Sequence, residues 1–132
     1  MADAEALRLA SEAVRAADST KATDIVALDV SGRLPLSDVF VLATGLSERQ
    51  VGGIVDAVEE RLAALGASPP RREGSGGARW VLLDYGGIVV HVMHAEDRDY
   101  YALDKLWKDC PELDLLDGGP ALTSGAVAAA GA

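Results

Sequence analysis

The residues of this chain that are best suited to chemistry lie in one stretch of seventeen, HVMHAEDRDYYALDKLW, which runs from His91 to Trp107. The stretch holds both histidines of the chain, several acids and three aromatic residues. Imidazole and carboxylate groups are common metal ligands and common general acids and bases. The stretch therefore raises three alternatives: a metal site, a catalytic site, or a surface that another macromolecule contacts.

The spacing of the two histidines disfavours a metal site. His91 and His94 stand three positions apart in a predicted strand, and side chains at i and i+3 of a strand point to opposite faces. The acids at 96–99 open a predicted helix, where they complement its dipole. Cys110 is the only cysteine, and no second cluster of ligands accompanies it. We therefore expect no bound metal and no other cofactor.

A catalytic site would also be incomplete. Asp84 and His91 are predicted diagonal neighbours that could form an acid–base pair, but no well-placed nucleophile is apparent, so a structural hydrogen bond is the preferred interpretation. The segment LATGLSERQ places Ser47 between a strand and a helix, as in nucleotidyltransferases, where the helix start holds phosphate. The matching pair of acids for magnesium is missing, because strand 79–85 offers only Asp84. A nucleotidyltransferase-type enzyme remains an alternative.

The spacing of apolar residues predicts the elements that position these groups. Helices are expected at 3–17, from a cap at Ser47 to Leu65, and at 96–107, and strands at 24–30, 39–44, 79–85 and 88–94. The segment 66–79 is a loop or a short edge strand. Ser47 and Gln50 form a predicted capping box. We interpret Gly52-Gly53 as a close backbone approach. The chain is expected to form one domain over residues 1–110, followed by a mobile tail over 111–132 that is rich in small residues.

The predicted hairpin has two unlike faces. If Gly86-Gly87 form the turn, Tyr85 pairs with Ile88, and alternation places every second residue on the same face. One face is nearly all aliphatic and must pack on the core. The other face is mixed, and it carries Trp80, Leu82, Asp84, Val89, His91 and Met93. Such a composition is typical of a protein contact, but a helix of the chain itself could equally cover this face.

Charge and composition limit the partners. The net charge is −9 and the pI is about 4.5, so the chain repels phosphate backbones and little direct nucleic-acid contact is expected. A basic protein is the favoured partner. A single cysteine excludes an internal disulfide and indicates a reducing, cytoplasmic setting. No apolar run is long enough to span a membrane.

Four segments of the chain resemble the ribosomal silencing factor family, also known as RsfS, YbeB or Iojap. In chain order they are DIVALDVSG, SDVFVLATGLSERQV, RWVLLDYGGIVVHVMH and DRDYYALDKLW. The resemblance implies an α/β fold with a mixed sheet of four to five strands and flanking helices, similar to nucleotidyltransferases but without known transferase activity. It also implies binding of the large (50S) ribosomal subunit through the basic ribosomal protein L-fourteen. The bound factor would block joining of the small subunit and repress translation under nutrient limitation. Homodimers are common in the family.

The resemblance and the mixed face together indicate partner-binding residues. Trp80 matches the tryptophan that opens the family's WVLLDYG strand, and it also lies on the mixed face. Three further residues come from the DRDYYALDKLW match. The expected partner-binding residues are Trp80, Leu82, Asp84, His91, Met93, Tyr100, Tyr101 and Leu103. A dimeric interaction module that works without the ribosome remains the second alternative.

Overall fold

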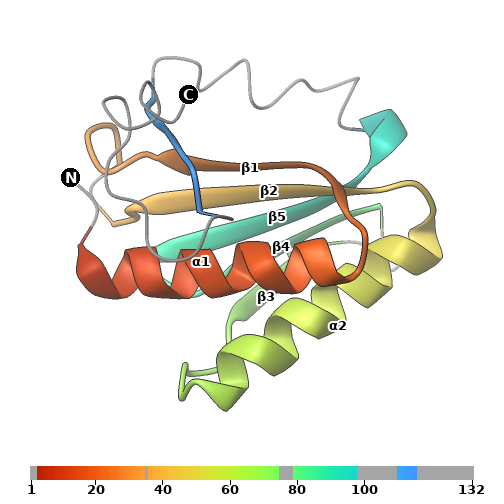
Figure 1. Ribbon diagram of the computed structural model, residues 1–132, viewed down its shortest axis with the longest axis horizontal. Coiled ribbons are helices and arrows are strands. Elements are labelled where there is room, and N and C mark those ends of the chain that lie inside the picture. Colours follow the sequence, from red (N-terminus) through yellow and green to blue (C-terminus); the bar gives the residue numbers. More distant parts are fainter. Residues whose placement is uncertain (1–2, 35, 75–78, 98–109, 116–132) are drawn as a thin grey trace.

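Two helices and six strands make up the described part of the chain, residues 3–34, 36–74, 79–97 and 110–115 of the computed structural model (Figure 1). Their order is α1 (Ala4–Ser19), β1 (Thr23–Asp29), β2 (Val39–Gly45), α2 (Glu48–Ala64), β3 (Arg71–Gly74), β4 (Trp80–Asp84), β5 (Ile88–His94) and β6 (Glu112–Leu113). A helical turn at 95–97 follows β5. No helix in these ranges has the length and apolar character needed to cross a membrane.

The strands form one sheet in the order β3-β4-β5-β2-β1-β6. β2 and β5 run parallel, and every other neighbouring pair is antiparallel. The expected α/β fold with a mixed sheet and flanking helices is therefore confirmed. The sequence predicts four to five strands, and the sheet has six. β6 has only two residues, too few for a periodic pattern. The likeness to nucleotidyltransferases stays a prediction.

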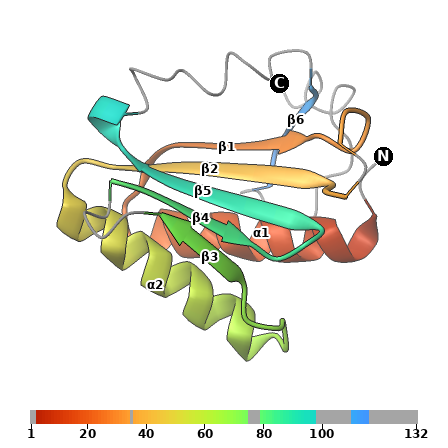
Figure 2. The same cartoon turned by 180° about the vertical axis from the view of Figure 1, so that it is seen from behind.

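Both helices cover the same face of the sheet (Figures 1 and 2). The buried side of α1 is built largely from alanines, including Ala10, Ala13 and Ala17, and small side chains let the helix approach the sheet closely. α2 contributes larger groups such as Ile54 and Leu62, both fully buried. The main core lies between this pair of helices and the strands.

The start of α2 is fixed by Gln50. Its backbone N–H donates to Ser47 Oγ over 3.1 Å, which confirms the predicted cap, and its side-chain oxygen accepts from the Leu46 N–H at 2.7 Å. The amide nitrogen of Gln50 donates to the carbonyl oxygens of Thr20 and Lys21, at 3.2 and 3.0 Å. Ser47 therefore caps α2, and the Gln50 side chain joins the residue before this cap to the end of α1.

Residues 111–115 pack on the domain. The Asp29 N–H donates to the Pro111 carbonyl over 2.8 Å, and Leu113 pairs with Ala27 of β1. Leu113 and Leu115 are buried and belong to the main core. These five residues fall inside the segment 111–132 for which the sequence predicts a mobile tail. That expectation stays a prediction for residues 116–132, which lie outside the described ranges.

The glycines around the start of α2 have different roles. A Cβ added at Gly52 or Gly53 would meet nothing within 4 Å, so the interpretation of these two as a close backbone approach is wrong. The close approach occurs at Gly45 instead, the last residue of β2. A Cβ there would lie 2.9 Å from the backbone nitrogen of Val51 and 2.9 Å from its Cγ2. The first turn of α2 therefore packs directly on the end of β2.

Gly53→Ala should raise the free energy of unfolding by about 1 kcal/mol, because alanine favours the helix and the added methyl group meets open space. Gly45→Ala should lower it, because the methyl group collides with α2. Urea denaturation followed by circular dichroism measures both changes. A Gly53→Ala variant that is less stable than the parent chain would contradict the open surroundings of this residue.

Candidate functional site

The predicted hairpin and its two faces are confirmed. Trp80 pairs with Met93, Leu82 with His91, and Asp84 with Val89, so these six side chains share one face of the sheet. The intervening residues of the hairpin pack in the main core under the helices; they are Val81, Leu83, Ile88, Val90 and Val92. The mixed face therefore lies on the side of the sheet opposite α1 and α2.

Exposure rises across the mixed face from β5 to β3. Val89, His91 and Met93 of β5 are buried, whereas the mixed-face residues of β4 are only partly buried. All four residues of β3 are exposed. Arg71 of β3 lies opposite Asp84 and Glu73 opposite Leu82, so this charged pair extends the same face. The centre of the face is apolar and its outer strand is charged.

A second, smaller core lies on this side of the sheet, over β5 and its neighbours β2 and β1. It consists of Leu28, Val30, Leu42, Met93 and Cys110, and the rings of Phe40 and Trp80 pack at its margin. Trp80 therefore belongs partly to the domain's own packing and remains partly open to solvent. The sequence left open whether the mixed face is covered by the chain itself or is available to a partner. The chain itself covers the β5 residues, whereas the β4 residues keep accessible surface.

The His91 side chain is buried. Its ring lies 4.9 Å from the Phe40 ring, and neither ring nitrogen has a hydrogen-bond partner in the described ranges. The expected hydrogen bond to Asp84 is wrong, because the Asp84 carboxylate accepts instead from the nearby Gly86 N–H at 2.8 Å. Burial lowers the pKa of His91 to about 4. A neutral imidazole so enclosed acts as part of the packing.

His94 takes part in the backbone at the far end of β5. Its Nδ1 accepts a hydrogen bond from the Glu96 N–H at 3.1 Å, and its own N–H donates to the Arg79 carbonyl at 2.7 Å. Within the part of the chain that the structure describes, no group of three or more His, Cys, Asp or Glu side chains is arranged so that it could hold a metal ion. That statement covers His91 and His94 but not Asp99.

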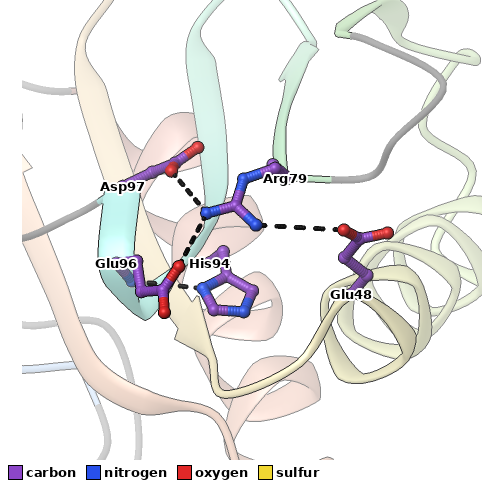
Figure 3. Close-up of polar contacts among 5 residues, drawn as sticks. All are labelled: Glu48, Arg79, His94, Glu96 and Asp97. Carbon is purple, nitrogen blue, oxygen red and sulfur yellow. Dashed lines mark hydrogen bonds and ion pairs between the residues drawn. The ribbon is translucent and has the colours of Figure 1, made fainter.

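Arg79 gathers three carboxylates at this end of the sheet (Figure 3). Its Nη2 lies 3.0 Å from Asp97 Oδ1 and 3.1 Å from Glu96 Oε1, and its Nη1 lies 3.8 Å from Glu48 Oε2. The hydrogen bonds to Asp97 and then Glu96 raise the pKa of Arg79. Residue-type reasoning overlooks Arg79. The hairpin register could have identified this residue, because it places Arg79 opposite His94 and hence near Glu96 and Asp97, which follow His94 in the chain.

Three of the expected partner-binding residues lie outside the described ranges, namely Tyr100, Tyr101 and Leu103. The other five are brought together on the mixed face, as the alternation predicts. Their assignment to partner binding stays a prediction.

Comparisons with known proteins extend the resemblance over nearly the whole chain. Residues 3–130 match the family model described as "Ribosomal silencing factor during starvation". A protein of Halalkalibacterium halodurans named ribosomal silencing factor RsfS is 42% identical over 115 residues, covering 87% of this chain and 96% of that protein. Its namesake in Bacillus subtilis is 42% identical over 103 residues, covering 78% and 87%. A crystal structure of a Chromobacterium violaceum protein has a TM-score of 0.73 at 32% identity, covering 89% of this chain and 92% of that one.

Stability should depend on the protonation of His91. Its pKa falls from 6.5 to about 4 on folding, so the unfolded chain binds a proton more readily between these values. The stabilisation is complete above pH 6.5 and should be lost as the pH falls towards 4, by up to about 3 kcal/mol.

Unfolding free energies measured between pH 4 and 7.5 test this expectation. The His91→Leu variant should lack this part of the pH dependence, and the control His94→Gln should keep it. An equal pH dependence in His91→Leu and the parent chain would contradict the burial of a neutral imidazole.

Proposed function

This chain belongs to the family of ribosomal silencing factors, and from that membership we propose that it binds the large (50S) ribosomal subunit through ribosomal protein L-fourteen. Bound there, it blocks joining of the small subunit and represses translation when nutrients are limiting. It acts in the cytoplasm as a regulator rather than an enzyme, and it needs no cofactor. Formation of a homodimer by the free protein belongs to the same proposal.

The observation that carries this proposal is the partly exposed apolar centre on β4. Trp80 and Leu82 present accessible apolar surface between the buried strand β5 and the charged strand β3. Protein interfaces commonly have an apolar centre and a polar rim, and tryptophan is among the residues that contribute most to binding. We assign partner contact to Trp80, Leu82 and Asp84. His91 and Met93 are buried on the same face beside β4, so we assign them a supporting role.

The charge of the chain favours a basic protein over RNA as the direct contact. A net charge of −9 attracts a basic surface and repels a phosphate backbone. The inhibition is steric, because a domain seated where the small subunit docks excludes it. Such a mechanism requires a stable face of the right shape and no reactive group.

Co-sedimentation with purified large subunits at physiological salt tests the proposal, with and without added small subunits. The chain should sediment with free large subunits and should be absent from joined ribosomes. Failure to sediment with large subunits would contradict the proposal and favour a ribosome-independent interaction module. Binding of nucleotide with magnesium would favour the nucleotidyltransferase alternative.

Trp80→Ala should weaken binding to large subunits by about 2 kcal/mol, roughly 30-fold in Kd, because it removes the largest side chain of the apolar centre. Some loss of stability is also expected, since the ring packs at the margin of the second core. Binding is therefore measured well below the melting temperature of the variant. Sedimentation over a concentration series gives the Kd.

Leu36→Ala serves as the control for the loss of exposed apolar surface. Leu36 is 86% exposed, and the neighbouring Ser37 hydroxyl donates to the Gly86 carbonyl at the opposite end of β4 from Trp80. This variant should bind like the parent chain. A folded Trp80→Ala variant with unchanged affinity would show that β4 is not the contact surface.

A further inference from the structure

We propose that Arg79 is a positioning residue for the partner-binding face, an inference that rests on the function proposed above. By joining the first turn of α2 to the turn after β5, Arg79 fixes the end of β4 from which Trp80 projects. Nothing in the family's name or in the motifs of the sequence assigns this role to it. The geometry of the carboxylates around its side chain carries the inference.

The guanidinium contacts two separate elements. Glu48 belongs to the first turn of α2, whereas Glu96 and Asp97 belong to the helical turn that follows β5. Figure 3 shows the guanidinium between these two groups of acids. Both terminal nitrogens of Arg79 are used, Nη1 towards α2 and Nη2 towards the turn. A planar group with several fixed donors orients its partners more strictly than an ammonium does.

The backbone of Arg79 is held at the same place. Its carbonyl accepts from the His94 N–H at 2.7 Å, which extends the pairing of β4 with β5 by one residue. The His94 ring in turn accepts from the Glu96 N–H at 3.1 Å and so fixes the start of the turn. Arg79 immediately precedes Trp80, so its side chain and backbone together determine where β4 begins.

The contribution of this cluster to global stability is small. The Arg79 side chain is 39% exposed, its partners Glu48 and Glu96 are more exposed still, and Asp97 is 24% exposed. Exposed ion pairs contribute little to folding, because solvent screens them. The cluster therefore matters for local geometry, and the place where that geometry has a consequence is the adjoining face around Trp80.

Positioning and long-range electrostatics predict opposite signs for the loss of Arg79. Replacing Arg79 makes the chain more negative, and charge alone would then strengthen attraction to a basic partner. If Arg79 positions Trp80, the same replacement weakens binding, because the three carboxylates lose the group that holds them together. The direction of the change in Kd therefore distinguishes a positioning role of Arg79 from a purely electrostatic effect.

Arg79→Met should raise the Kd for large subunits about fivefold, a size typical of coupled neighbouring residues. Arg8→Met is the matched control, since Arg8 pairs with Glu5 on the exposed surface of α1 at 2.9 Å and its loss changes the net charge equally. The control should bind as tightly as the parent chain or more tightly. Arg79→Lys should recover part of the affinity. An unchanged or lower Kd for Arg79→Met would overturn the inference.

A double-mutant cycle tests whether Arg79 acts through Trp80. In a Trp80→Ala background, Arg79→Met should have little further effect on the Kd. An undiminished effect in that background would mean that Arg79 contacts the partner directly, which would also overturn the positioning role.

A measurement without the ribosome keeps the inference separate from the proposed function. In a Trp107→Phe background Trp80 is the only tryptophan, since the chain has two, and acrylamide quenching reports its accessibility. Arg79→Met should increase quenching, and Arg8→Met should not. If the parent chain fails to bind large subunits, the proposed function fails, and the quenching result still decides whether Arg79 positions Trp80. Equal quenching in both variants would refute it.

Discussion

The parallel pairing of β2 with β5 is the constraint on which the rest of the structure depends. Both strands are apolar on both faces, so each face of the sheet must be covered where they lie. The two helices cover one face, and the second core around Leu42 and Met93 fills part of the other. That cover extends only partly over β4, and the partly open apolar surface at Trp80 and Leu82 results from this limit.

The same pairing explains why the polar cluster lies at one end of the sheet. The carboxyl ends of β2 and β5 meet, with Gly45 beside His94. From this point the chain enters α2 on one side and the turn at 95–97 on the other. Backbone groups at both starts need partners. Ser47, Gln50 and His94 satisfy some of them, and Arg79 joins the acidic side chains of the two turns.

Local patterns made much of the fold and part of the candidate site predictable. Gly86-Gly87 and strict alternation determine the hairpin register and hence the residues of the mixed face. Features that depend on distant parts of the chain were not predictable. The Asp84–His91 hydrogen bond fails because the closer Gly86 N–H competes for the carboxylate. In the sequence Gly52-Gly53 look like the glycines that allow a close backbone approach. That approach occurs at Gly45, and only the position of α2 in the folded chain shows it. The role of Arg79 could be recognised only from the hairpin register together with the position of Glu48 in the folded chain.

The two edge strands of the sheet, β3 and β6, affect how readily the protein aggregates. An unprotected edge strand can pair with another molecule and let the sheet grow into an aggregate. Here β3 carries Arg71, Arg72 and Glu73, all exposed, and charged side chains discourage such pairing. At the other edge, β6 pairs with part of β1, whose first residues are distorted by a bulge and by the positive φ of Asp24. Pairing through the backbone, which would accept any strand, is thereby disfavoured at both edges of the sheet.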